Sequence, residues 1–527
     1  MASPKTFFVI LILICSSVHI AGAATYYVDP VNGDIANTGD KENPWDTLEQ
    51  VFRRRKALAA GDTLLLYSGH HGTVNIRGEN TDYITILPVG NNQPTIKRIN
   101  FGGAKKWKLI GMTISPETAP EYMQTTLLRI SNSSSDIIVD NCMCYSVENS
   151  SAWSKNDWNT KACSGASIEG HNNVIKNSHF LNVEHGVLVE SSARENLIDN
   201  NVVENFAADG MRGIGSHNTF QYNTIKNCYD VDENHDDGFQ SYSQSSEGVG
   251  KTTVYDIVLR GNIIINSTDP NQKYKGTLQG IGCFDGMYED WLVENNIVIT
   301  DHWHGISLYG ARNCTIINNT VVDLNDSSPG PPWIKITAHK NGTKSENNII
   351  RNNLTTTMSN DANIGEVDHN IIVKNYDRYF TDYDNFDLRL KKDCPAVDAG
   401  SDNGAPPIDI AGTSRPQGDG VDIGAYEYTE NTGVSNESNI PDEIQLSNYP
   451  NPFNRGTVID YQLPIRSSIE LSIYNILGHK ICTLADEVQN AGQHSVHFNA
   501  DQLSSGVYFY RIKTNRFERI RKMSLQK

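Results

Sequence analysis

The sequence predicts an all-β protein, in which a right-handed parallel β-helix solenoid is followed by a small C-terminal β-sandwich. Between about residues 100 and 375, a short pattern recurs in which two apolar positions flank an asparagine or a similar residue. The segments that carry it are rich in Val, Ile and Thr and are bounded by Gly and Asn, which is typical of strands and tight turns. Helical periodicity over ten or more residues is absent there. A strand-rich unit repeated at short intervals indicates a solenoid.

The polar residue of this pattern marks one position in each predicted coil. It falls at Ser178, Asn201, Asn223, Asn262, Asn296, Asn319 and Asn352. A base interval of about 22 residues with variable additions fits coils that carry loops of different length. Asparagines placed once per coil can stack as a hydrogen-bonded ladder, and asparagine tolerates the left-handed conformation of a sharp bend. We therefore interpret the many Asn-x-Ser/Thr matches as structural rather than as glycosylation sites.

The N-terminus has the pattern of a secretory signal peptide over residues 1–23. Lys5 supplies a positive charge, residues 7–15 are apolar, and the small residues 21–23 precede the expected cleavage point. The apolar stretch is shorter than the ~20 residues of a membrane-spanning helix, and no later segment approaches that length. We therefore expect an exported protein with no membrane span.

The β-helix domain is expected over residues 24–428, with both of its ends covered, because exposed sheet edges favour aggregation. Residues 46–60 interleave apolar side chains with the basic run 53–56, which predicts an amphipathic capping helix with a solvated basic face. Residues 386–427 resemble the terminal stretch that is common in secreted β-helix proteins. We interpret that stretch as the closing coils.

The C-terminal part of the chain has a different character. A linker rich in Asn, Ser, Glu and Thr spans 429–443, and residues 444–527 alternate like the strands of a small β-sandwich. The strings at 449–454, 459–464, 471–478 and 506–512 closely resemble the C-terminal sorting domain of the type IX secretion system. The resemblance implies export through an outer membrane by that machinery, followed by cleavage or surface attachment, so that the protein is secreted or attached to the cell surface.

Charge and cysteine usage exclude several classes of function. The formal net charge of −18 argues against nucleic acid or an anionic membrane as a partner, and an anionic substrate would need a local basic patch. Once Cys15 is removed with the signal peptide, the remaining cysteines are too sparse for a disulfide scaffold, and no zinc-ligand spacing stands out. We expect a monomer without an organic cofactor.

A second recurrent element is a glycine followed by a short strand. If these elements stack as one sheet, the residue after each glycine points inward and the next residue faces solvent. The predicted inward row is Val187, Met211, Phe239, Ile281, Ile306 and Ile334. The predicted outward row is Leu188, Arg212, Gln240, Gly282, Ser307 and Lys335. The residues just before the glycines form a parallel row of His185, Asp209, Asp237, Gln279, His304 and Pro332.

One face of the coil is therefore expected to carry carboxylates, cations and aromatic rings beneath the longest loops, as a saccharide cleft requires. The candidate catalytic residues are Asp237, His304, Lys335, Arg212 and Tyr242. The candidate substrate-binding residues are Gln240, Tyr309, Trp303, Trp333, Lys275 and His235. Asp209 and Asp236 are the candidate ligands of a Ca²⁺ ion. Asp-Gly is also a common turn pair, so a purely structural role for Asp236 and Asp237 stays open.

Two reactions fit these residue types. A lyase needs a base for the proton α to a uronate carboxyl group, here His304, Tyr242 or a lysine. It also needs a cation that neutralises that carboxylate, here Arg212, Lys335 or Ca²⁺. A hydrolase instead needs one protonated and one ionised carboxyl group, which the three aspartates could supply.

Resemblances to known families support both the lyase and the hydrolase reaction. Residues 237–242 look like the Asp-Gly-Phe-x-x-Lys segment of one β-helix pectate lyase family, but Tyr242 stands where that family has its base lysine. The order of the aspartates, His304 and Lys335 is similar to the polygalacturonase series. Ala207-Ala208 and Trp333 depart from that series, and an extra coil separates Asp237 from His304.

The N-terminal segments 25–30 and 60–64 are similar to those of many secreted β-helix lyases, including alginate- and chondroitin-type enzymes. We therefore predict a polysaccharide lyase that acts by β-elimination on an extracellular, uronate-containing polysaccharide. The alternatives are a polygalacturonase-like inverting glycoside hydrolase, a non-catalytic glycan-binding or adhesin β-helix, and a C5-epimerase.

Overall fold

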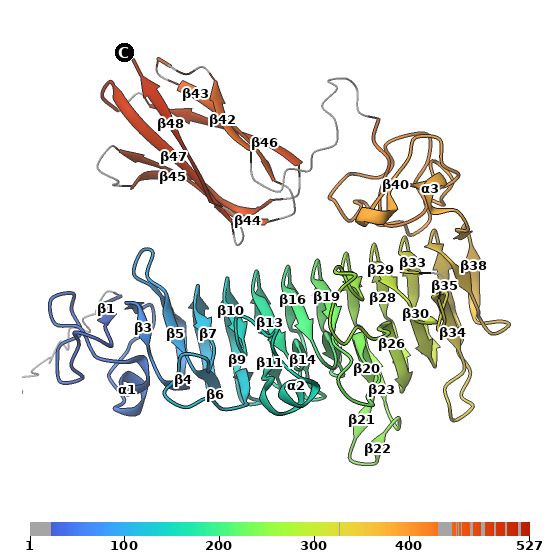
Figure 1. The fold of residues 1–527 in the computed structure, drawn as a ribbon, viewed down its shortest axis with the longest axis horizontal. Coiled ribbons are helices and arrows are strands. Elements are labelled where there is room, and N and C mark those ends of the chain that lie inside the picture. Colours follow the sequence, from blue (N-terminus) through green and yellow to red (C-terminus); the bar gives the residue numbers. More distant parts are fainter. Residues whose placement is uncertain are drawn as a thin grey trace, which may run out of the picture.

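The computed structural model describes residues 23–325, 327–430 and, with short gaps, most of 445–526 (Figure 1). The predicted signal peptide lies outside the described residues except for Ala23, and so does the predicted linker except for its first two residues. Both therefore stay predictions. No helix in the described part of the chain is long and apolar enough to cross a membrane.

The chain forms the predicted parallel β-helix, whose coils stack side by side in Figure 1. A 22-stranded and a 12-stranded sheet run along its axis, and neighbouring coils pair in parallel throughout both. The first coils contain β1 (Thr25–Val28), β2 (Thr63–Leu66), β4 (Thr73–Pro88) and β6 (Arg98–Ile110). The long strand β6 pairs with two later strands, β8 and β9, so the 22-stranded sheet continues as two faces of the coil.

One of these faces, which we call the site face, takes one strand from each coil. Its strands are β8 (Thr126–Ile130), β11 (Ser164–Ile168), β14 (Val187–Val189), β17 (Met211–Gly213), β20 (Asp237–Tyr242), β26 (Gln279–Asp285), β30 (His304–Tyr309), β34 (Trp333–Thr337) and β37 (Thr357–Met358). The second face consists of β9 (Ser135–Asp140), β12 (Val174–Lys176), β15 (Leu197–Asp199), β18 (Thr219–Gln221), β24 (Val258–Arg260), β28 (Leu292–Glu294), β32 (Thr315–Ile317), β35 (Asn348–Arg351) and β38 (Gly365–Asp368).

The 12-stranded sheet closes each coil, and the inward side chains of all three faces form one continuous apolar core. Its strands are β3 (Gly69–His70), β5 (Pro94–Ile96), β7 (Thr113–Ile114), β10 (Met143–Tyr145), β13 (His179–Val183), β16 (Val202–Phe206), β19 (Thr224–Cys228), β25 (Ile263–Ile265), β29 (Ile297–Thr300), β33 (Thr320–Asp323), β36 (Leu354–Thr355) and β39 (Ile371–Ile372). Short additional strands lie in the loops: β21 (Gln244–Ser245), β22 (Gly248–Val249), β23 (Thr253–Tyr255), β27 (Met287–Glu289) and β31 (Ala311–Arg312).

The predicted asparagine ladder is present, and it is buried. Asn296 is representative: its Nδ2 donates to the Leu259 carbonyl at 2.8 Å and to Asn319 Oδ1 at 2.9 Å, while its Oδ1 accepts from the backbone and side chain of Asn262. The members are Asn201, Asn223, Asn262, Asn296, Asn319, Asn353 and Asn370, and Ser178 begins the row.

One member of the predicted ladder is wrong. Asn353, not Asn352, continues the buried row after Asn319. Asn352 belongs to the neighbouring row of bend residues with positive φ (φ 56°), which also includes Asn295 and Asn318. Two adjacent asparagines serve two different purposes at this corner, one as a left-handed bend and one as a ladder amide, and the repeated pattern alone does not distinguish them.

The predicted capping helix is shorter than expected. Helix α1 spans Leu48–Arg53 and buries Leu48 and Val51 against the first coils, while Arg53, Arg54 and Arg55 are exposed. It ends because Arg55 adopts a left-handed conformation (φ 53°), and the Lys56 N–H then closes back on the Val51 carbonyl at 3.0 Å. The solvated basic face is thus confirmed, whereas the helix does not extend to residue 60.

The segment after β39 does not add the closing coils that we predicted. It contains α3 (Tyr376–Tyr379), β40 (Phe380–Asp382), a 3₁₀ turn (Tyr383–Asn385) and β41 (Asp387–Leu390), and then runs without regular structure to residue 428. Its apolar side chains pack on outward-facing residues of β25, β29, β33 and β36, such as Ile299 and Val322. The segment therefore covers the outside of the 12-stranded sheet, where those strands carry apolar residues on both faces.

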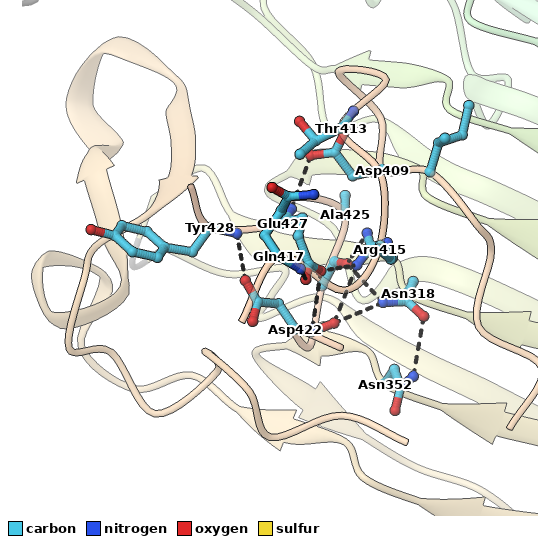
Figure 2. A network of polar contacts seen from close by, with 12 residues as sticks. Asn318, Asn352, Asp409, Thr413, Arg415, Gln417, Asp422, Ala425, Glu427 and Tyr428 are labelled. Carbon is cyan, nitrogen blue, oxygen red and sulfur yellow. Dashed lines mark hydrogen bonds and ion pairs between the residues drawn. The ribbon is translucent and has the colours of Figure 1, made fainter. Parts of the chain in front are cut away.

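A buried polar network fixes this segment in place (Figure 2). Arg415 is the centre: its guanidinium donates to Glu427 Oε2 at 3.1 Å and to Asn295 Oδ1 at 3.1 Å, and both side chains of the Arg415–Glu427 pair are almost fully buried. Asp409 and Asp422 accept from the backbone N–H groups of Glu427 and Tyr428 respectively. Because every carboxylate of this network accepts backbone hydrogen bonds, the segment is held in a single conformation.

The C-terminal module is an antiparallel β-sandwich. One sheet contains β42 (Gln445–Tyr449), β43 (Gly456–Leu463) and β46 (Gly492–Asn499), and the other contains β44 (Ser467–Asn475), β45 (Lys480–Gln489), β47 (Gly506–Thr514) and β48 (Glu518–Leu525). Side chains of both sheets, including Ile459 and Ile512, share one core. The predicted fold of this module is confirmed.

Replacing Asn296 with alanine tests the ladder. The substitution leaves the buried Asn262 N–H without its acceptor and removes the amide donor to the Leu259 carbonyl, so we expect the free energy of unfolding to fall by about 1–3 kcal/mol. Asn271→Ala, in an exposed loop, should change it by less than about 0.5 kcal/mol. Denaturant unfolding followed by circular dichroism measures both values, and equal effects of the two substitutions would contradict a stabilising role for the ladder.

Candidate functional site

The site face begins at a row of glycines that turn the chain from the 12-stranded sheet into each site strand. A Cβ at Gly186 would lie 2.2 Å from the Gly210 carbonyl oxygen, and one at Gly280 would lie 2.4 Å from the Gly305 oxygen. Gly210 and Gly238 are crowded in the same way. Side chains are excluded from this corner because successive coils stack there backbone on backbone.

The predicted register of the site strands is confirmed. Val187, Met211, Phe239, Ile281, Ile306 and Ile334 are successive partners and are buried. Leu188, Arg212, Gln240, Gly282, Ser307 and Lys335 are successive partners in the outward row, which we call the ladder row. With about 4.8 Å between neighbouring strands, the part from Arg212 to Lys335 extends about 19 Å along the axis.

The exposure of several side chains on the site face and the strand pairing of one residue differ from the prediction. Within the ladder row, Arg212, Gln240 and Lys335 are half-buried, whereas Leu188, Gly282 and Ser307 are buried. In the row before the glycines, Asp209 and Asp237 are only 3% and 1% exposed. His304 pairs with Trp333 instead of Pro332, because the register shifts between His304 and Ile306.

Asp209 and Arg212 form a buried ion pair. Nε and Nη2 of Arg212 both donate to Asp209 Oδ2, at 3.1 and 2.5 Å, and His185 Nε2 lies 3.4 Å from Arg212 Nη2. Burial raises the pKa of Asp209, and Arg212 opposes that rise. The two charge-assisted hydrogen bonds favour the ionised form of Asp209.

Asp236 lies at the corner before β20, where Cys228 Sγ donates to its Oδ2 at 3.3 Å. Burial raises the pKa of Asp236 to about 7, and the nearby Asp209, Asp230 and Asp232 add to this rise. Asp236 is therefore partly protonated at neutral pH.

Asp237 is the most enclosed of the three carboxyl groups. Its Oδ2 accepts from Gln240 Nε2 at 2.9 Å, and its Oδ1 has no hydrogen-bond partner among the described residues. Oδ1 lies over Gly282 on the next coil, where a Cβ would be 2.1 Å away and would also meet the Phe284 ring. Burial, with the charge of Asp209, raises the pKa of Asp237 well above its usual range. The protonated form of Asp237 is therefore favoured.

A cluster of aromatic and imidazole rings surrounds His304 further along the axis. His302 stacks on His304 with 5.2 Å between ring centroids, and Phe284 and Trp333 meet it edge-on. Burial, with His302 and Lys335 nearby, lowers the pKa of His304 to about 4, so the imidazole is neutral. The sequence places His302 and His304 two residues apart, and that spacing could have indicated this pair.

Ser307 and Trp333 hold the imidazole ring of His304 in place. Trp333 Nε1 donates to Ser307 Oγ at 3.0 Å, and His304 Nδ1 lies 2.9 Å from the same oxygen. A hydroxyl oxygen has two lone pairs and one hydrogen, so Ser307 can either accept from Nδ1 or donate to it, and the contact is compatible with both tautomers of His304. The neutral imidazole can therefore act as a hydrogen-bond donor or as an acceptor.

The remaining candidate residues separate into two groups. Tyr242 lies against Arg212, whose guanidinium carbon is 5.6 Å from the ring centroid, and Lys335 Nζ lies 4.8 Å from the Trp333 ring and 5.7 Å from that of Tyr309. Trp303, 43% exposed, stands beside His302. The structure thus gathers these residues at the site face.

Two loop residues remain at the rim of the site. His235 is exposed, and its charge lowers the pKa of His302 and His304. Lys275 is exposed and lies near Asp301 instead of near the ladder row. Sequence reasoning also missed Cys228, because a buried thiol in a coil gives no signal that it touches a carboxyl group.

The expected Ca²⁺ ligands do not form a metal site of the usual kind. Within the described ranges, no group of three or more His, Cys, Asp and Glu side chains is placed to hold a metal ion. Asp209 is paired with Arg212, whose guanidinium supplies the positive charge that a cation would bring. Calcium stays a prediction, and no step below depends on it.

Comparison with known proteins adds the identity of the C-terminal module. Residues 447–526 match the family described as the secretion system C-terminal sorting domain. No curated protein matches the chain in sequence.

Several solved structures share features of the fold at low similarity. Pectate lyase Pel9A is 14% identical, with a TM-score of 0.43, and the match covers 78% of this chain and 98% of that one. A tailspike protein of E. coli bacteriophage HK620 is 10% identical, with a TM-score of 0.34, over 96% of this chain and 85% of that one. A lacto-N-biosidase from Eubacterium ramulus is 10% identical, with a TM-score of 0.28, over 66% and 68%. The fold assignment rests on the parallel register of the coils, and the sorting domain places the protein outside the outer membrane, either secreted or on the cell surface.

Proposed function

We propose that the protein is a secreted enzyme that hydrolyses a polysaccharide on the site face, with Asp237 as the general acid and Asp209 as the ionised carboxylate. One observation carries the proposal: a buried carboxyl group with an unpartnered oxygen lies on the coil next to a carboxylate held by an arginine. Glycoside hydrolysis requires one carboxylic acid that keeps its proton and one that has lost it.

The contacts of Asp237 support the role of an acid. Gln240 donates to Oδ2, so the proton belongs on Oδ1, which has no hydrogen-bond partner among the described residues. A glycosidic oxygen within hydrogen-bond reach of Oδ1 would accept that proton as the bond to the leaving sugar breaks. Asp209, on the adjacent coil, would take a proton from the water that attacks the sugar.

The outer surface of the site face supports a sugar polymer as substrate. Tyr242, Tyr309 and Trp333 are half-buried along the ladder row and Trp303 is exposed beside it, and aromatic rings of this kind pack on the apolar faces of sugars. The sorting domain delivers the protein to the compartment where such polymers are found.

A second candidate is the lyase reaction predicted from the sequence. It is supported by the position of Tyr242 against Arg212, because a phenol beside a guanidinium could remove the proton α to a uronate carboxyl group. It is disfavoured because Arg212, the cation beside Tyr242, is already paired with Asp209 and is not free to neutralise a substrate carboxylate next to that phenol. We therefore rank elimination below hydrolysis.

Product analysis distinguishes the candidates. We expect pectate, alginate or glycosaminoglycans to yield new reducing ends without the absorbance near ~235 nm of an unsaturated uronate. Absorbance would support the lyase. Retention on a glycan column without any product would support a binding protein, and altered C5 configuration without cleavage would support an epimerase.

Substitution of the two carboxyl groups tests the catalytic assignment. We expect Asp237→Asn and Asp209→Asn each to lower kcat about 10²–10⁴-fold, because each removes one proton-transfer group. Asp301→Asn is the matched control, since Asp301 is also buried, with a pKa raised by burial, but bonds Asn266 and Asn325. Full activity of Asp237→Asn would contradict the assignment of Asp237 as the general acid.

The pKa of Asp236 predicts a pH-dependent stability. Its folded pKa of about 7 exceeds the unfolded value of 3.8, so between these pH values the native state binds a proton that the unfolded state has lost. This proton stabilises the native state at low pH, and that stabilisation is lost as the pH rises toward 7. Asp236→Asn should remove a decline on the order of 3 kcal/mol between pH 4 and 8. Urea unfolding at both pH values measures this, with the exposed Asp402→Asn as control. An unchanged decline in Asp236→Asn would contradict the raised pKa.

A further inference from the structure

Most cations on and beside the ladder row are already neutralised by carboxylates of the protein. The ion pairs are Arg129–Glu169 at 2.6 Å, Arg212–Asp209 at 2.5 Å and Lys340–Asp285 at 2.9 Å. These three cations are therefore not available to an anionic ligand without breaking an existing pair.

Lys335 differs from these cations. Its Nζ lies over the rings of Trp333 and Tyr309 and makes no ion pair among the described residues. Asp361, the carboxylate whose pKa Lys335 helps to lower, accepts instead from Thr337 Oγ1 and the Ala338 N–H at 2.7 and 2.8 Å. Lys335 thus presents a positive charge between two aromatic rings, near the neutral imidazole of His304.

The rest of the site is acidic. The loop before β20 carries the exposed Asp232 and Glu233, and the chain as a whole has a formal net charge of −18. A polymer with a carboxylate on every sugar would place several negative charges along the ~19 Å between Arg212 and Lys335, where Lys335 is the one unpaired cation among the described residues of the ladder row. The other carboxylates would be repelled by the protein.

We propose that the substrate is a heteropolysaccharide in which acidic sugars are separated by neutral ones, and that Lys335 binds the carboxylate of one acidic sugar between Trp333 and Tyr309. This inference rests on the proposed function and names the substrate class for the same site. The neutral neighbours of the acidic sugar lie along the remainder of the ladder row, where Gln240 and Tyr242 offer an amide and an aromatic ring.

Charge density can be varied on one backbone to test this. The full-length Asp237→Asn protein, which binds without cleaving, is titrated with polygalacturonate, alginate and hyaluronan, each in native, partly carboxyl-reduced and fully carboxyl-reduced form. We expect partial reduction to strengthen binding of the two homopolyuronates, and full reduction to weaken binding of every polymer about tenfold, as the loss of one charged contact does. Tightest binding by the fully charged homopolyuronates would overturn the inference.

Substitution of Lys335 provides a second test. Lys335→Met keeps the apolar stem over the two rings and should remove the tenfold difference between partly and fully reduced polymers, whereas Lys340→Met should leave it unchanged. Equal discrimination in wild type and Lys335→Met would overturn the inference while the proposed hydrolysis stands. Neither binding nor cleavage of any polymer by the wild-type protein would contradict the proposed function itself, and the inference with it.

Discussion

The buried amide ladder is the interaction on which the rest of the molecule depends. Each ladder asparagine bonds forward to the next coil and sideways to a backbone carbonyl, so a slip by one residue in any coil would leave several buried polar groups without partners. Apolar packing also opposes a one-residue slip, but it opposes a two-residue slip less strongly, because Val, Ile and Leu on neighbouring coils are nearly interchangeable. The ladder therefore fixes the register, and with it the rows of side chains that make up the site face.

The candidate site departs from the way in which the rest of the β-helix buries its polar groups. Three aspartates are buried there with a single arginine, and one carboxyl oxygen has no partner in the part of the chain that the structure describes. Burying carboxyl groups in this way destabilises a protein, and elsewhere in this chain buried carboxylates are paired or accept backbone hydrogen bonds, as Asp409 does. Such a local conflict within an otherwise consistent structure is typical of functional sites. It is a stronger argument for catalysis than the residue types alone.

Features that depend on residues close together in sequence could be predicted, whereas features that depend on contacts between distant residues could not. The glycine-strand pattern predicted every pairing of the ladder row, because alternation and repeat length are local properties. Burial of Asp237 could not be predicted, because it results from Gly282 and Phe284, which reach the same space from the next coil. The surroundings of His304 likewise depend on Trp333, about 30 residues away in sequence, whose ring meets the imidazole edge-on. The outer packing of residues 394–428 was missed because an apolar segment after a repeat looks the same whether it adds a coil or covers a sheet.

The glycine corner has a consequence for how such a site can diverge. Because successive coils cross this corner backbone on backbone, the coil that contains Gly280 separates Asp237 from His304 by whole strand steps. The distance from the acid to the lysine subsite is then counted in coils and changes only in steps of one strand spacing, about 4.8 Å. The number of coils therefore sets the length of sugar chain that fits between Asp237 and Lys335, and a duplication or deletion of a coil in the gene would change that length.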